Sequence, residues 1–130
     1  AYQGRRKEVF RQWSEDMRAL AACPNVTVKL GGLGMRVTGF GFSEGADPPS
    51  SEQLAAAWRP YVLACIEAFG AERCMFESNF PVDKGSYSYV CCWNAFKRLT
   101  ADASSDEERA LFSGTARRVY RIAEPAVEQE

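Results

Sequence analysis

The sequence has 130 residues, of which 46% are hydrophobic and 25% are charged, with 16 Lys and Arg residues against 17 Asp and Glu residues. These numbers are typical of one ordinary globular domain without a concentrated basic surface, so we expect neither a nucleic acid nor a membrane as a partner. The sequence contains no histidine, which excludes a Ser/His/Asp triad, a Cys/His pair and a histidine-rich zinc site made by this chain alone.

The first part of the sequence predicts a helix, a short strand and a long loop. Between residues 4 and 22, apolar residues recur at spacings of three and four, as they do on one face of a helix. Residues 26–30 alternate and are rich in β-branched side chains, which predicts a strand that ends in a glycine-rich turn. Several glycines and prolines interrupt residues 35–50, and loops of this length are often functional.

The middle of the sequence predicts a second helix and a second strand. Ser50 or Ser51 is a suitable helix cap, and Gly70 is a suitable end for the same helix. Because Pro60 lies inside the apolar stripe, we expect it to kink or restart the helix. Residues 73–80 then predict a strand that the following proline closes.

The last third of the sequence predicts two more helical regions. The first carries three apolar side chains on one side, namely Val90, Trp93 and Phe96. Ser104 is followed three residues later by Glu107, a capping-box pattern that begins a last helical region running to residue 122. We expect residues 1–123 to form the folded part and residues 124–130 to be a disordered tail.

Alternation of strands with helices of this length predicts an α/β fold with a parallel sheet. Two strands make a poor sheet, because three or four helices cover the faces and edges of a parallel pair only in part. The sequence also begins without an initiator Met. We therefore expect this chain to be part of a larger α/β fold.

The five cysteines favour reduced thiols. Their number is odd, two of them are adjacent, and no two have the CxxC spacing. Free cysteines usually behave as small apolar core residues. Together with the lack of a charged-then-apolar signal at the start of the sequence, this predicts a cytoplasmic location.

Polar residues near the ends of both predicted strands suggest a site. Alternation along the second strand places Glu77 and Asn79 on one face at its carboxyl end, and Lys29 is near the carboxyl end of the first strand. Parallel α/β folds place their sites at this end of the sheet. The pattern predicts a polar cavity, with a solvated sheet face as the alternative. Asp83 would either turn back towards the strand end or cap the following helix.

Four segments of the sequence resemble the C-terminal part of the amidohydrolase-related proteins of the amidohydrolase superfamily. They are PNVTVKLGGLGM, WRPYVLACIEAFGAERCMFESNFPVDK, WNAFKR and LFSGTARRVYRI. These proteins are TIM-barrel hydrolases that include sugar-lactone and dicarboxylate-lactone hydrolases and related decarboxylases. The resemblance covers residues 4–122 and is most specific over residues 73–84.

The resemblance implies that residues 1–123 are a partial TIM-barrel domain. They would form the C-terminal portion of a (β/α)8 barrel, about the last two βα units plus a preceding helix. Residues 26–30 would be the seventh strand, and residues 73–79 would be the eighth. Because such a barrel needs about 250 residues, the implied partner is the N-terminal part of the same barrel, which would contain the histidines that this chain lacks.

The resemblance also implies a hydrolase that acts on a lactone, ester or amide bond of a small carboxylated or sugar-like molecule. Family members typically end the eighth strand in Ser-Asp-Trp-Pro, whose Asp ligates metal or activates water, whereas here Asn79 stands at the Asp position. An amide orients water but does not accept its proton. We therefore expect Asn79, Asp83 and Glu77 as the catalytic candidates and Lys29 as a group that binds the substrate anion.

A divalent metal such as zinc is implied for the full-length enzyme, and this chain completes no site for it. We expect the fragment alone to be inactive. Two alternatives stay open at this point: a non-catalytic βα scaffold or interaction fragment that docks with an N-terminal partner, and a decarboxylase, which is a lyase, of the same superfamily. The Asn at position 79 indicates either a different source of the carboxylate or a chemistry that has shifted or been lost.

Overall fold

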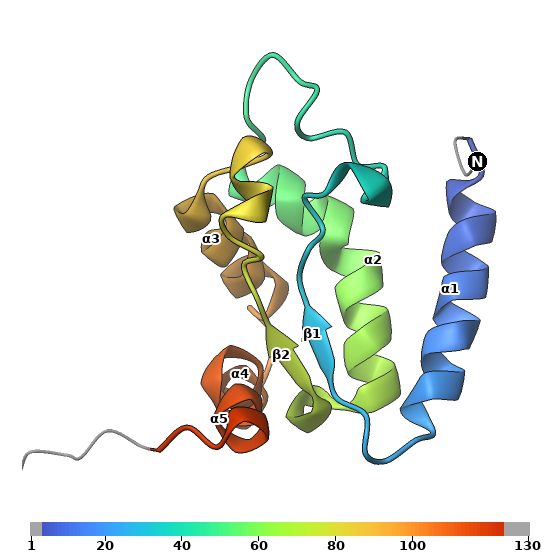
Figure 1. Cartoon of the computed structure of the whole chain (residues 1–130), viewed down its shortest axis with the longest axis vertical. Coiled ribbons are helices and arrows are strands. Elements are labelled where there is room, and N and C mark those ends of the chain that lie inside the picture. The colour runs from blue at the N-terminus through green and yellow to red at the C-terminus, as the bar shows by residue number, and fades with distance from the viewer. Residues whose placement is uncertain (1–3, 124–130) are drawn as a thin grey trace, which may run out of the picture.

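The computed structural model describes residues 4–123, in which helices surround one pair of strands (Figure 1). The helices and strands in chain order are α1 (Arg6–Ala21), β1 (Val28–Leu30), α2 (Ser51–Phe69), β2 (Cys74–Phe76), α3 (Tyr89–Leu99), α4 (Ser105–Arg109) and α5 (Thr115–Tyr120). Short 3-10 turns cover Arg36–Thr38, Ala71–Arg73 and Val82–Gly85, and a π-helical turn covers Ala110–Gly114. The tail predicted for residues 124–130 lies outside the described residues.

The two strands are parallel, and α2 forms the crossover between them. Val28 pairs with Cys74, Lys29 with Met75 and Leu30 with Phe76. This confirms the predicted parallel βα arrangement. Because both strands run in the same direction, the loop after β1 and the segment after β2 meet at one end of the molecule, at the top of Figure 1.

Both strands are shorter than predicted. The chain before β1 is still in a turn, where the backbone N–H of Val26 donates to the carbonyl oxygen of Cys23. Arg73 belongs to a 3-10 turn, so β2 begins one residue later than expected. At the far end, the N–H of Glu77 makes the last bond to β1, through the Leu30 carbonyl at 3.2 Å. Within residues 4–123, no strand pairing continues beyond Leu30, so the predicted alternation does not extend to Asn79.

The core lies between α2, α3 and one face of the strands. Trp58 of α2 is 1% exposed, and the ring of Phe76 from β2 stacks on Phe96 from α3 with centroids 4.3 Å apart. Trp13 and Trp93 are half-buried and pack against this core. All five cysteines are free; the expected core position is right for Cys65, Cys74 and Cys92, Cys91 is half-buried, and Cys23 is exposed. The alternative of a solvated sheet face does not hold within β2, because Cys74, Met75 and Phe76 are all buried.

One helical expectation needs correction. Pro60 does not restart α2, which is one continuous helix with buried residues on both sides of the proline, Trp58 before it and Val62 after it. Burial of this stripe outweighs the one backbone donor that proline lacks. The predicted last helical region is present as α4, the π-helical turn and α5, which follow one another without a gap. The capping boxes at Ser50 and Ser104 are both present.

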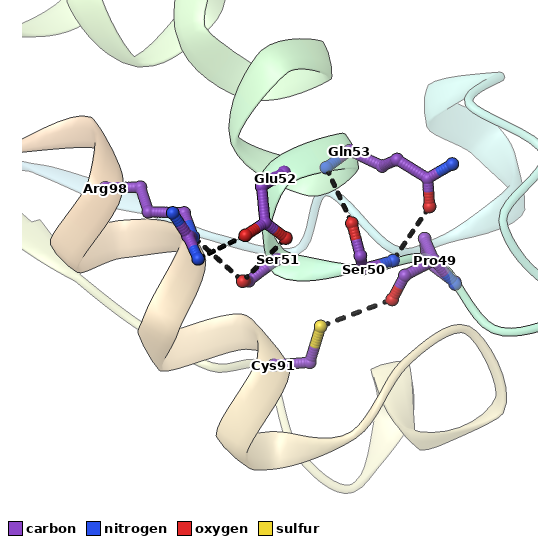
Figure 2. A network of polar contacts seen from close by, with 7 residues as sticks. All are labelled: Pro49, Ser50, Ser51, Glu52, Gln53, Cys91 and Arg98. Carbon is purple, nitrogen blue, oxygen red and sulfur yellow. Dashed lines mark hydrogen bonds and ion pairs between the residues drawn. The ribbon is translucent and has the colours of Figure 1, made fainter.

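A polar network joins the start of α2 to α3 (Figure 2). Arg98 of α3 forms an ion pair with Glu52, and its Nε donates to Ser51 Oγ at 2.9 Å. Cys91 Sγ donates to the carbonyl oxygen of Pro49 at 3.2 Å. These contacts hold the end of the loop that follows β1 against α3. Between residues 4 and 123, no helix has both the length and the apolar character needed to cross a membrane.

Candidate functional site

The first predicted pair of site residues, Lys29 and Glu77, forms an ion pair across the two strands. Lys29 Nζ donates to Glu77 Oε2 at 2.8 Å, and the two side chains are 50% and 29% exposed. The hydrogen bond to the Glu77 carboxylate raises the pKa of Lys29, and the negative charge acts in the same direction. Lys29 therefore stays protonated at neutral pH, beside a carboxylate that solvent reaches.

Gly31 makes the position of Glu77 possible. A Cβ atom at residue 31 would lie 2.2 Å from Glu77 Cγ and 2.4 Å from the Glu77 carbonyl oxygen. Only glycine leaves room for the backbone segments that follow β1 and β2 to approach each other this closely. The glycine after β1 thus sets the place where the Glu77 side chain leaves β2.

The second pair, Asn79 and Asp83, lies in the segment after β2. Asn79 has a left-handed backbone with φ +55°, and its Nδ2 donates to Asp83 Oδ1 at 3.0 Å. The N–H of Asp83 donates to the Asn79 carbonyl oxygen at 3.1 Å, which closes the turn between them. Asp83 therefore turns back towards the strand end. The alternative of a helix cap is wrong, because Ser88 caps α3.

The Asp83 carboxylate is buried and accepts three hydrogen bonds. Its exposure is 1%. Besides the bond from Asn79, its Oδ2 accepts from the hydroxyl of Tyr87 at 2.7 Å and from the N–H of Gly34 at 3.2 Å. A buried carboxylate is tolerated where several donors satisfy it. Asp83 thus joins the loop after β1 to the segment after β2.

Sequence reasoning missed Tyr87, Ser86 and Gly34. Tyr87 is 3% exposed, and burial, followed by the hydrogen bond to Asp83, raises the pKa of its hydroxyl, so it donates at all ordinary pH values. Ser86 Oγ donates to the Gly34 carbonyl oxygen at 2.7 Å. The four-residue spacing from Asp83 to Tyr87 is the only local signal, and it is common in any turn or helix.

Gly34 also has no space for a side chain. A Cβ atom there would lie 2.6 Å from Tyr87 Cε1 and 2.8 Å from Asp83 Cγ. The loop after β1 therefore contacts the buried Asp83–Tyr87 pair directly through its backbone.

The four predicted residues form two pairs at the carboxyl ends of the strands. Within residues 4–123, no hydrogen bond or ion pair links Lys29 or Glu77 to Asn79 or Asp83. The polar character expected of this end of the sheet is present, in the form of one exposed ion pair and one anchored amide.

A cavity of about 660 Å3 opens beside this end of the sheet. It lies between the loop around Phe42 and Pro48 and the segment from Phe80 to Tyr89, so both strand-end segments contribute to it. The ring of Phe80 contacts Tyr89 edge to face, with centroids 5.3 Å apart. The cavity wall is mixed, with aromatic rings from Phe42, Phe80, Tyr87 and Tyr89 among small and polar residues.

The described residues do not fit a complete metal centre. Residues 4–123 contain no group of three or more His, Cys, Asp and Glu side chains that could hold a metal ion. Glu77 is paired with Lys29, and Asp83 already accepts three hydrogen bonds. Asn79 offers only a neutral amide oxygen, which is a weak ligand for zinc.

Comparison with known proteins identifies related sequences. The model of the amidohydrolase family matches residues 2–122. An uncharacterised protein y4mH from Sinorhizobium fredii is 43% identical over 87% of this chain and 34% of its own length. An L-fucono-1,5-lactonase from Burkholderia multivorans is 34% identical over 88% of this chain and 37% of its own length. The chain therefore spans little more than a third of these relatives.

Two crystal structures of an amidohydrolase from Burkholderia multivorans have a similar fold, both with 31% identity. The structure with bound HEPES has a TM-score of 0.79 and covers 95% of this chain, which corresponds to 41% of that protein. The structure with bound zinc has a TM-score of 0.75 and covers 88% of this chain, which corresponds to 38% of that protein.

Proposed function

Since this chain belongs to the amidohydrolase family, we propose that it is the C-terminal portion of a hydrolase that cleaves a lactone, ester or amide bond of a small carboxylated or sugar-like substrate. The relatives named L-fucono-1,5-lactonase make a sugar lactone the first substrate class to test. One observation carries this function: Lys29 and Glu77 form an ion pair at the carboxyl ends of parallel strands, where α/β enzymes bind substrate, and Asn79 follows in the same segment as Glu77.

In this proposal β1 is the seventh strand of a (β/α)8 barrel and β2 is the eighth. The parallel register and the crossover by α2 support this assignment, as does the coverage of 41% of a solved amidohydrolase. The N-terminal part of the same barrel would pair with the strand edges that have no partner within residues 4–123. It would also supply any metal site, since the residues described here do not form one.

In this proposal three residues of this chain have different roles in hydrolysis. The Lys29 ammonium group binds the substrate anion beside the reacting carbonyl. The Glu77 carboxylate takes a proton from the attacking water as its oxygen bonds to the carbonyl carbon, and returns it to the leaving oxygen when the C–O bond breaks. Asn79 orients the water without taking its proton.

The experiment that tests this function is an assay of the full-length protein on a panel of sugar lactones, simple esters and amides. We expect hydrolysis of at least one carboxylated or sugar-like lactone, a kcat reduced by about 100-fold or more in Glu77→Gln, and a raised KM for anionic substrates in Lys29→Met. Glu67→Gln, an exposed change on α2, is the control. The 130-residue chain alone is expected to be inactive.

Other outcomes would overturn the proposal. Release of CO2 without hydrolysis would favour the decarboxylase, and unchanged turnover in Glu77→Gln would remove this residue from the chemistry. Turnover by the 130-residue chain alone would contradict the expected inactivity. A full-length protein that turns over no substrate, while the chain binds an N-terminal partner, would favour the interaction fragment.

A further inference from the structure

One end of the Asn79 amide is fixed by Asp83, and the other end is free. Only the nitrogen of an amide can donate to a carboxylate, so the 3.0 Å bond to Asp83 Oδ1 places Nδ2 on that side. The Asn79 oxygen must then point away from Asp83. Within residues 4–123 it accepts no hydrogen bond, and it is not among the buried polar atoms that lack a partner.

Asp83 cannot turn to accommodate Asn79. Its second oxygen is held by the Tyr87 hydroxyl at 2.7 Å and the Gly34 N–H at 3.2 Å, from two different segments. Its side chain is enclosed, since Asp83 is 1% exposed and the Gly34 backbone lies against it. The orientation of the Asn79 amide is therefore decided by a carboxylate that is itself immobilised.

We propose that Asp83 is a positioning residue that keeps the Asn79 side-chain oxygen facing the carboxyl ends of the strands, as an acceptor for the attacking water or a substrate hydroxyl. Which group donates a hydrogen bond to the Asn79 oxygen, the attacking water or a substrate hydroxyl, rests on the proposed function. The orientation of the amide does not rest on it.

The variant Asp83→Asn tests this directly, because it changes the donor pattern with little change in shape. The new amide oxygen can still accept from Gly34 and Tyr87, so its nitrogen must face residue 79. Asn79 then has to flip, which offers an NH2 donor where the oxygen was. The fold is expected to survive, while the acceptor at the strand end becomes a donor.

The double variant Asn79→Asp with Asp83→Asn restores the acceptor. The new amide at position 83 donates to the new carboxylate at position 79, and every hydrogen bond of the cluster is satisfied again. The single variant Asn79→Asp instead places two carboxylates about 3 Å apart, which is strongly unfavourable. Asn94→Asp, an exposed change on α3, makes the same change of charge and serves as its control.

The experiment records the side-chain amide signals of 15N-asparagine in the full-length protein, together with denaturation midpoints and kinetics at pH 7. Asn79 is assigned by the loss of its signal in Asn79→Asp. We expect a downfield, slowly exchanging Asn79 proton that disappears in Asp83→Asn, and a lower midpoint in Asn79→Asp that the double variant recovers. In Asp83→Asn we expect a kcat lower by up to about 100-fold, with KM less affected, and recovery in the double variant.

The spectra separate this proposal from the proposed function. An Asn79 amide signal that is unchanged in Asp83→Asn would overturn the positioning role, whatever the turnover. The positioning role would also be overturned if the double variant lost as much stability as Asn79→Asp. If the spectra change as expected but the full-length protein hydrolyses none of the panel, the proposed function fails and the positioning of Asn79 stands.

Discussion

The guanidinium group of Arg73 donates a hydrogen bond of 2.9 Å to the carbonyl oxygen of Ala21, the last residue of α1. It also donates to the carbonyl oxygens of Cys23 and of Phe69, the last residue of α2, each at 3.0 Å. Helix ends leave carbonyl groups without partners, and Arg73 satisfies one such carbonyl in each of the two helices. This side chain thus fastens the amino end of the parallel pair, opposite the candidate site.

Arg73→Ala is expected to lower the free energy of unfolding by about 3 kcal/mol, because several charge-assisted hydrogen bonds are lost together. Arg73→Lys keeps the charge but not the planar fork, so we expect an intermediate loss. Urea denaturation measures both. Arg11→Ala, an exposed change on α1, is the control, and a loss in Arg73→Ala no larger than in this control would contradict the role described for Arg73.

Gly34→Ala is expected to destabilise the protein by about 2 kcal/mol or more, because the new methyl group meets the Tyr87 ring and Asp83 inside a packed region. Gly85→Ala provides the matched control, since a Cβ atom at Gly85 has no neighbour within 4 Å. Thermal unfolding compares the two variants. Equal stability of the two would show that the loop after β1 does not pack on Asp83 as described.

Tyr87 predicts a loss of stability at alkaline pH. Its pKa is raised in the folded protein above the ordinary value of 10.0, mainly by burial and then by its hydrogen bond to Asp83. Above pH 10 the unfolded chain loses this proton while the folded chain keeps it, so unfolding becomes more favourable as pH rises. Below pH 10 the contribution is constant. We expect the unfolding free energy to fall more steeply above pH 10 in the protein than in Tyr87→Phe.

Tyr89→Phe is the control for this measurement, because Tyr89 is 51% exposed. Burial also raises the pKa of Cys65 to about 11 and the pKa values of Cys74 and Cys92 to about 12. Ionisation of these thiols in the unfolded chain also lowers the free energy of unfolding as pH rises, but it does so equally in every variant. The difference between the variants therefore isolates the contribution of the tyrosine. The prediction would be contradicted if the unfolding free energies of Tyr87→Phe and Tyr89→Phe fell with the same slope above pH 10.

The contacts in Figure 2 are expected to differ in their effect on stability. Ser50→Ala removes the side chain that accepts from the Gln53 N–H at 3.2 Å, and loss of such a cap costs about 1 kcal/mol. Arg98→Ala breaks an exposed ion pair with Glu52, which contributes at most about 1 kcal/mol. In 1 M salt we expect the effect of Arg98→Ala to shrink and that of Ser50→Ala to stay. Equal salt dependence of the two would be the contrary result.

The helices could be predicted from the sequence because their signals are local. Apolar spacing located α1, α2 and α3, and the Ser50 and Ser104 caps lie three residues from their partners. The ends of the strands could not be predicted in this way. β2 ends at Phe76 because β1 ends at Leu30, and that pairing joins residues far apart in the chain. The π-helical turn between α4 and α5 has no local signal that we recognise.

The sequence by itself determined which chemical groups this protein can use: no histidine, and Lys29, Glu77, Asn79 and Asp83 beside two strands. Strand direction then predicted that these groups lie at one end of the sheet. Only the tertiary structure decided how they pair. Lys29 meets Glu77 across 48 residues, and the burial of Asp83 depends on a glycine 49 residues before it. Such contacts depend on how closely two distant backbones approach, a quantity that packing sets and local sequence patterns do not contain.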